Sequence, residues 1–119
     1  LGHNEIKISE VGEINIQSDW YDYEAKYLKS KNITIIPAKI PMKVKKRVQD
    51  LTLKACNAIS AKGLARVDFF YDEKNDDVLI NEINTLPGFT MQSMYPSLWE
   101  ASGIPLPKLV SHLIETAQN

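Results

Sequence analysis

The order of apolar and polar positions predicts short strands in the first third of the chain. Residues 4–16 alternate loosely around Gly12, which is typical of two short strands or of one bent strand. Residues 32–38 read NITIIPA, a β-branched run that predicts another strand, and Pro41 closes it. Between them, residues 18–27 read SDWYDYEAKY and follow neither period. A long loop so rich in aromatic side chains is typical of a functional segment.

The pattern changes to a helical period in the middle of the chain. Apolar side chains recur every three or four residues from Met42 to Ala61, which predicts an amphipathic helix. We expect Gly63 to cap its C-terminal end. Residues 64–72 and 77–84 then read as two strands, and the polar turn EKND between them predicts a β-hairpin.

Two further helices are predicted near the end of the chain, at residues 94–102 and 105–118. Tyr95 and Trp99 lie at helical spacing and are expected to pack against the last helix. The sequence therefore predicts an α+β fold, in which an antiparallel sheet is packed by helices.

Composition narrows the class of protein. The 119 residues are 44% hydrophobic and 24% charged, as in an ordinary globular domain, and the net charge of -1 argues against a nucleic-acid partner. The single cysteine, Cys56, excludes a disulfide framework, fits a reducing compartment and is expected to be buried. The basic run at 43–47 predicts a solvated helix face. No apolar run reaches the roughly 18–20 residues of a membrane span and no signal peptide is visible, so we expect a cytoplasmic protein without a membrane partner.

The second hairpin strand ends in an unusual polar sequence, because NEIN directly follows an apolar run. If the turn is centred on Asn75, Asp68 lies opposite Glu82 and Arg66 lies opposite Asn84. Two carboxylates so placed repel each other unless a cation neutralises them. The oxygen-only set predicts a Mg²⁺ site, and the lack of His and Cys in it argues against zinc.

Strict alternation places Val78 and Ile80 on the same face as Glu82. Apolar neighbours such as Phe69 predict that the strand pair lies largely out of water. The alternative is a solvated hairpin face on which Arg66 makes a surface ion pair.

The loop after the hairpin offers two more polar groups. Gly88 permits a close backbone approach and an oxyanion-binding N–H, or it forms a plain turn. Ser93 is either the N-cap of the next helix or a hydroxyl directed at a substrate carboxylate. The sequence leaves both alternatives open.

Three segments together resemble the C-terminal part of the D-alanine–D-alanine ligases, ATP-grasp enzymes of bacterial cell-wall (peptidoglycan) synthesis. They are YDYEAKY (21–27), GLARVDFF (63–70) and NEINTLPGFTMQSMYPSLWEASG (81–103). An acid followed by E-x-N on the next strand is shared by ATP-grasp enzymes in general. The NTxPGFT and SMYP sequences, with YDYEAKY before them, resemble this ligase family in particular, and the resemblance covers nearly the whole chain.

The resemblance implies specific roles for the hairpin and the loop that follows it. Asp68, Glu82 and Asn84 match the ligands of Mg²⁺ (or Mn²⁺) in the family. Arg66 matches an arginine that stabilises the transferring phosphoryl group and the tetrahedral intermediate. Gly88 matches a glycine whose N–H helps to form the oxyanion hole.

The resemblance also implies a substrate site beside these groups. Ser93 and Met94 match positions that hold the carboxylate of the second D-alanine. Lys26 matches a lysine that reaches the phosphate or that carboxylate, and Tyr27 matches a tyrosine that closes the loop over the site. This loop, 18–28, is then a lid that excludes water from the reaction.

The implied reaction uses ATP to phosphorylate the first D-alanine, and the amine of the second D-alanine then attacks the acyl phosphate. Members of the family are longer than this chain. We therefore expect residues 1–119 to be the C-terminal half of an ATP-grasp catalytic domain, without the N-terminal domain and most of the ATP pocket, and inactive alone. The full-length protein is expected to be a homodimer. The alternatives are a ligase with another acceptor (D-serine or D-lactate) and a non-catalytic packing or dimerisation module.

Overall fold

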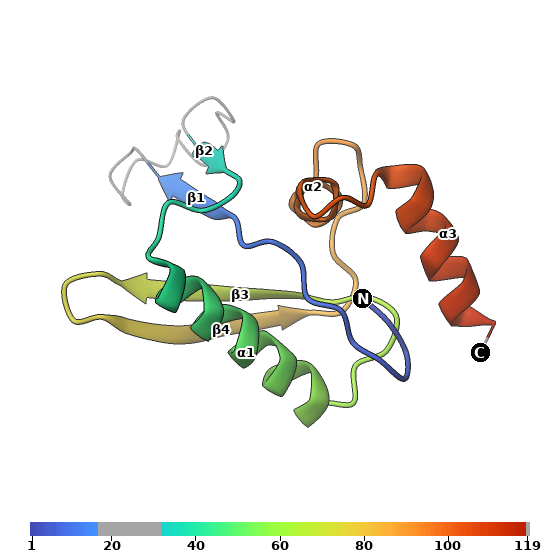
Figure 1. Ribbon diagram of the computed structural model, residues 1–119, viewed down its shortest axis with the longest axis horizontal. Coiled ribbons are helices and arrows are strands. Elements are labelled where there is room, and N and C mark those ends of the chain that lie inside the picture. Colours follow the sequence, from blue (N-terminus) through green and yellow to red (C-terminus); the bar gives the residue numbers. More distant parts are fainter. Residues whose placement is uncertain (17–31, 119) are drawn as a thin grey trace.

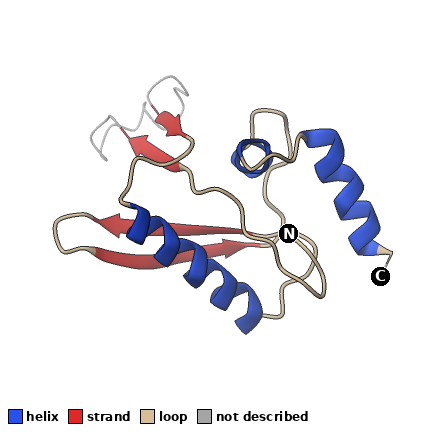
Figure 2. Cartoon of the chain, viewed as in Figure 1, coloured by secondary structure: helices blue, strands red, loops and turns tan. Residues whose placement is uncertain are grey.

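The computed structural model describes residues 1–16 and 32–118, which form an α+β fold as predicted (Figure 1). Helices and strands follow the order shown in Figure 2. The elements are β1 (Glu13–Ile16), β2 (Asn32–Ile35), α1 (Met42–Ala58), β3 (Arg66–Asp72), β4 (Asp77–Asn84), α2 (Met94–Ala101) and α3 (Leu106–Ala117).

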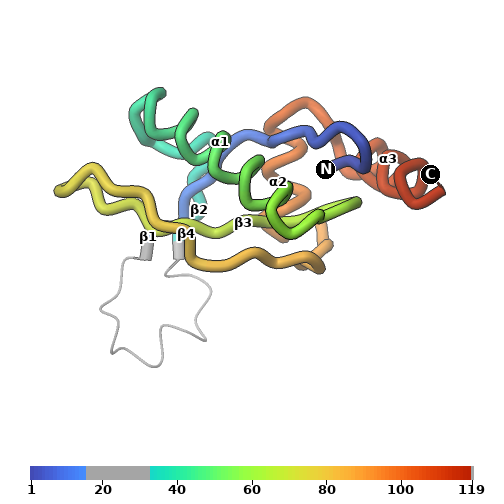
Figure 3. Tube along the Cα trace, turned by 90° about the horizontal axis from the view of Figure 1, so that it is seen from below, coloured from blue at the N-terminus to red at the C-terminus, as the bar shows by residue number. Residues whose placement is uncertain are grey.

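The strands form two separate antiparallel pairs within the described residues, β1 with β2 and β3 with β4. Helix α1 packs along one face of the β3–β4 hairpin, as the view from below makes clear (Figure 3). Helices α2 and α3 pack on each other beyond the open end of the hairpin (Figure 1). Helix α1 therefore covers one face of the hairpin and not the other.

Helix α1 ends earlier than the sequence predicts. Its last residue is Ala58, and Ser60 adopts the left-handed conformation (φ 54°) that we expected of Gly63. Gly63 lies three residues further on, where its N–H and C=O pair with those of Gly2 at 2.8 and 3.0 Å. Gly63 thus holds the N-terminal turn against the start of β3 rather than capping the helix.

The prediction of a solvated helix face for the basic run of α1 is confirmed for Lys43 and Lys46, which are exposed, but not for Lys45. Lys45 Nζ lies 2.6 Å from Glu10 Oε1, and both side chains are only about one-fifth exposed. Arg47 donates to the backbone carbonyl of Asp76 at 3.1 Å, and Lys43 lies 3.8 Å from the carboxylate of the same residue. The run therefore joins α1 to the N-terminal segment and to the hairpin turn.

The core of the C-terminal half consists of Tyr95, Trp99 and Leu109, each less than 5% exposed. The Tyr95 and Trp99 rings meet edge to face, with centroids 6.4 Å apart. Their packing against α3 confirms the sequence prediction. Cys56 is buried as predicted, on the separate apolar face that α1 turns inward with Val44 and Val48.

Replacing Leu109 by Ala is expected to lower the free energy of unfolding by about 2–5 kcal/mol, because Leu109 is fully buried and the change leaves a cavity. Urea denaturation of the chain measures this. Ile114→Ala on the same helix is the control, since Ile114 is 56% exposed and the expected loss is below about 1 kcal/mol. An equal loss of unfolding free energy in the two variants would contradict the burial of Leu109 in the core.

The Tyr95 hydroxyl is buried without a hydrogen-bond partner among the described residues, and burial raises the pKa of Tyr95 to about 12. We expect Tyr95→Phe to leave stability unchanged or raise it by about 1 kcal/mol, because it removes an unsatisfied polar group. An unfolded tyrosine ionises near pH 10, so the wild type loses stability between about pH 10 and 12 relative to the variant. Urea denaturation of both proteins across this pH range checks the difference, and parallel stability curves would refute it.

Candidate active site

The register of the β3–β4 hairpin brings the predicted polar residues together. Asp68 pairs with Glu82 and Arg66 pairs with Asn84, as the sequence predicts. Paired residues of an antiparallel ladder lie on the same face, with Cβ atoms about 4.5–5.5 Å apart. We call these four residues the polar face of the hairpin.

This register depends on a bulge that the sequence analysis did not predict. Pairing shifts between Asp68 and Phe69, so that Phe69 lies opposite Ile80 and Asn81 has no partner in the described ladder. Between the turn and the shift, the strands keep one register, which starts with Asp72 opposite Asp77. If that register continued, Asp68 would face Asn81, and Glu82 would be on the face that α1 covers. The extra residue therefore selects Glu82 as the partner of Asp68.

The bulge also corrects the predicted grouping of apolar residues. Val78 and Ile80 lie opposite Tyr71 and Phe69, on the other face from Glu82. Strict alternation had placed them on the same face, because it does not include an inserted residue.

The prediction that the strand pair is largely out of water is wrong for this chain. Phe70 and Leu79 pair with each other beyond the polar face, and they are 61% and 54% exposed. Helix α1 lies on the other side of the hairpin (Figure 3), so it does not cover these two apolar side chains.

Arg66 and Asp68 form a bidentate pair within the polar face. Arg66 Nε lies 2.8 Å from Asp68 Oδ1, and Nη2 lies 3.0 Å from Oδ2. The hydrogen bonds to Asp68, with the added charge of Glu82, raise the pKa of Arg66, which is therefore fully charged. Its charge offsets the repulsion between the two carboxylates that face each other across the hairpin.

The polar face continues directly into the loop after β4. Asn84 Oδ1 accepts a hydrogen bond from the Leu86 N–H at 3.1 Å, which shapes the start of the loop as an Asx turn. Further along, a Cβ on Gly88 would lie only 3.1 Å from Ser93 Oγ, a tight contact. Gly88 thus permits a close approach of the loop to Ser93, and its oxyanion-binding role stays a prediction.

Ser93 occupies the N-cap position of α2, but its hydroxyl makes no capping hydrogen bond within the described residues. The Thr90 N–H donates to Ser93 Oγ at 3.0 Å, and the hydroxyls of the two residues lie 2.7 Å apart. Thr90 was not among the predicted site residues. The spacing T-x-x-S in GFTMQS is the signal that indicates such a contact.

Of the three remaining predicted site residues, the structure describes only Met94. Met94 begins α2 and its sulfur lies 3.4 Å from where a Cβ on Gly12 would be, so its side chain packs toward the segment before β1. Lys26 and Tyr27 lie outside the described residues.

The donor set of the polar face fits a hard divalent cation. Mg²⁺ is commonly held by one or two carboxylates together with waters and substrate phosphates. Asp68 keeps acceptor capacity beside Arg66, because a carboxylate offers about four lone-pair sites, and Asn84 Oδ1 keeps one. Among the described residues no cluster of three or more His, Cys, Asp or Glu side chains could hold a metal ion.

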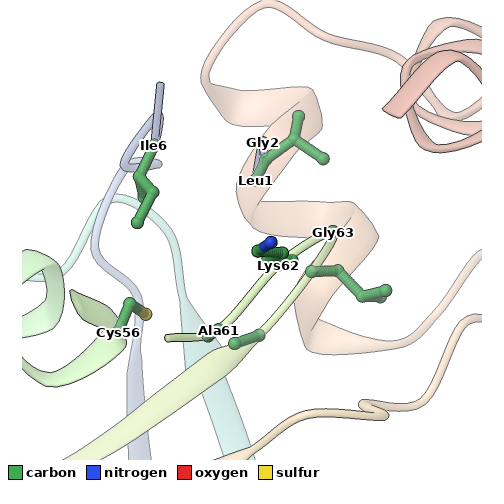
Figure 4. Close-up of a pocket in the computed structure, with 9 residues that line it drawn as sticks. Leu1, Gly2, Ile6, Cys56, Ala61, Lys62 and Gly63 are labelled. Carbon is green, nitrogen blue, oxygen red and sulfur yellow. The ribbon is translucent and has the colours of Figure 1, made fainter. Parts of the chain in front are cut away.

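A small pocket lies elsewhere in the described part of the chain, beside the Gly2–Gly63 pairing (Figure 4). It is lined by Ile6, Leu64 and Cys56 among others and includes none of the predicted site residues. Burial raises the pKa of the Cys56 thiol, which keeps it protonated and unreactive. None of the described helices has the length and apolar character needed to cross a membrane.

Comparison with known proteins gives the family. The family model described as D-ala D-ala ligase C-terminus matches residues 1–115. The chain is 61% identical over 117 residues to a D-alanine–D-alanine ligase of Prochlorococcus marinus, covering 98% of this chain and 33% of that protein.

Solved structures agree with this result. The VanG D-Ala:D-Ser ligase from Enterococcus faecalis superposes with a TM-score of 0.84 at 33% identity, covering 98% of this chain and 34% of that one. The D-alanine–D-alanine ligase from Bacillus anthracis complexed with ATP matches with a TM-score of 0.66 at 32% identity, covering 72% of this chain and 29% of that one. The chain spans about one third of the length of these relatives. With its hairpin, loop and helices matched from residue 1 to residue 115, the chain belongs to the D-alanine–D-alanine ligase family, whose C-terminal part it matches.

Proposed function

We propose that this chain is the C-terminal part of an ATP-dependent ligase that joins two D-alanines for peptidoglycan synthesis. The observation that carries the proposal is the pairing of Asp68 with Glu82 across the hairpin. Arg66 and Asn84 share that face, which leads directly into the loop of Gly88 and Ser93. The continuity of this face with the loop supports a site that takes both phosphate and carboxylate groups.

Asp68, Glu82 and Asn84 are proposed to hold Mg²⁺ or Mn²⁺. The ion, when bound, neutralises negative charge on the phosphates of ATP. The Asp68–Arg66 pair leaves a positive guanidinium at the edge of the same set. Arg66 can therefore donate hydrogen bonds to the phosphoryl group as it moves from ATP to the carboxylate of the first D-alanine.

The loop after the hairpin is proposed to serve the second step. The Gly88 N–H has no acceptor among the described residues and can donate to the oxygen of the tetrahedral intermediate. Ser93 is proposed to bind the carboxylate of the second D-alanine. Met94, whose side chain packs inward, contributes through its backbone N–H at the uncapped first turn of α2.

The reaction then balances in two steps. The carboxylate of the first D-alanine attacks the γ-phosphorus of ATP, and ADP leaves. The amine of the second D-alanine attacks the resulting acyl phosphate, loses a proton and expels inorganic phosphate. Lys26 and Tyr27 are proposed to belong to a lid over this site that excludes water from the acyl phosphate.

D-Serine is a specific alternative acceptor, because one matched structure is a D-Ala:D-Ser ligase. D-Alanine is favoured, since the relative that is 61% identical is a D-alanine–D-alanine ligase. Consumption of ATP implies a cytoplasmic site of action, and the full-length protein is proposed to be a homodimer.

Assay of the full-length protein tests the function. We expect ATP-dependent formation of D-alanyl-D-alanine, with one phosphate released per dipeptide, and little product from D-serine or D-lactate in direct competition. The isolated 119-residue chain is the matched comparison and is expected to make no dipeptide, since it spans only one third of its relatives. A full-length protein that makes no dipeptide would overturn the proposal. Dipeptide synthesis by the isolated chain would refute the expectation that it is inactive alone.

Glu82→Gln in the full-length protein is expected to lower kcat by about 10²–10³-fold or more, because it removes a charge from the polar face without changing side-chain volume. Glu73→Gln is the control, since Glu73 is exposed in the turn of the same hairpin. Its kcat is expected to stay within about twofold of wild type. Thermal melting checks that both variants fold. A near-normal kcat for Glu82→Gln would exclude Glu82 from the metal site.

A further inference from the structure

Ser93 and Thr90 are joined by three hydrogen bonds at the entrance to α2. The Thr90 N–H donates to Ser93 Oγ at 3.0 Å, and the Ser93 N–H donates to the Thr90 carbonyl oxygen at 3.0 Å. The third bond joins the two hydroxyls, 2.7 Å apart, and either hydroxyl can be its donor. The position of the Ser93 hydroxyl is thus fixed by one residue, Thr90.

These contacts fill both acceptor positions of the Ser93 hydroxyl when the Thr90 hydroxyl donates to it. A serine hydroxyl has one proton to donate and two lone pairs that accept. The Thr90 N–H fills one lone pair. When the Thr90 hydroxyl donates as well, the second lone pair is filled, and the proton of Ser93 is the only group left to interact with a ligand. The hydroxyl then acts purely as a hydrogen-bond donor.

An anionic ligand selects this arrangement over the reverse one. A carboxylate has no proton to give, so it can bind Ser93 only by accepting its proton. Thr90 must then donate to Ser93, which forms a chain from the Thr90 hydroxyl through the Ser93 hydroxyl to the ligand. Hydrogen bonds in such a chain polarise and strengthen one another.

The local structure keeps this hydroxyl available. A serine at an N-cap ordinarily accepts from an N–H in the first helical turn, and within the described residues Ser93 makes no such bond. Thr90 and Gly88 are exposed and Ser93 is half-buried, so a ligand can reach the hydroxyl. The uncapped first turn of α2 adds a positive partial charge beside it.

We propose that Thr90 is a positioning residue, which makes the Ser93 hydroxyl a dedicated donor for the carboxylate of the acceptor amino acid. The inference rests on the proposed function and extends it, because it assigns acceptor affinity to a residue that is not expected to touch the substrate. A Ser93 hydroxyl that only donates favours acceptors with a free carboxylate.

The experiment compares Thr90→Val with Thr90→Ser in the full-length protein. Valine keeps the shape and the backbone N–H but lacks the hydroxyl, whereas serine retains the hydroxyl. We expect Thr90→Val to raise the KM of the second D-alanine about 10-fold, equivalent to about 1.4 kcal/mol. The KM of ATP should stay within about twofold, and Thr90→Ser should restore the acceptor KM to within about twofold of wild type.

Each outcome of this experiment decides the proposal. An unchanged acceptor KM in Thr90→Val overturns it. An equal rise in the KM of ATP also overturns it, and so does a Thr90→Ser variant as impaired as Thr90→Val. Either of the last two results indicates a role in loop structure alone. Should Thr90→Val melt at a much lower temperature than wild type, Thr90→Ala gives the same comparison. A wild-type protein that makes no dipeptide refutes the proposed function itself, which is a separate result.

Discussion

The site depends on one electrostatic constraint, the facing of Asp68 and Glu82 across an antiparallel hairpin. Two carboxylates at this separation repel each other, and the bidentate pair between Arg66 and Asp68 offsets that repulsion at 2.8 and 3.0 Å. The face therefore carries an excess of acceptor oxygens next to one fixed cation. Such a balance suits a site that receives both a metal ion and phosphate groups.

The rest of the fold holds this hairpin in place from its other side. Helix α1 covers the opposite face, and Arg47 and Lys43 contact Asp76 at the turn. The residue Asp76 has a left-handed backbone (φ 48°), so these contacts hold a constrained turn. At the other end, the chain runs from Asn84 into the loop and then into the buried core around Trp99. The groups of the proposed site thus lie between the packing of α1 at one end and the buried core at the other.

The loop between β4 and α2 joins the two chemical halves of the proposed site. Its polar groups are tied to one another rather than to the helix that follows, as the contacts of Thr90 with Ser93 show. A helix that leaves its first turn uncapped gives up some stability, since a serine cap is worth about 1 kcal/mol. That loss agrees with the proposed role of the serine hydroxyl and the free N–H groups in binding a carboxylate.

The sequence by itself determined most of the elements and the family, because period, turn residues and motif spacing are local properties. It predicted the pairing of Asp68 with Glu82 from a turn centred on Asn75, but the register next to the turn would pair Asp68 with Asn81. It also indicated the buried pair of Tyr95 and Trp99 from helical spacing alone. Only the tertiary structure decided that a bulge at Asn81 produces that pairing, that Ser60 rather than Gly63 ends α1, and that the Ser93 hydroxyl contacts Thr90. It also decided that Phe70 and Leu79 are open rather than buried. These features depend on register and on which face a neighbouring element covers, and a single inserted residue reverses both without leaving a distinct pattern in the sequence.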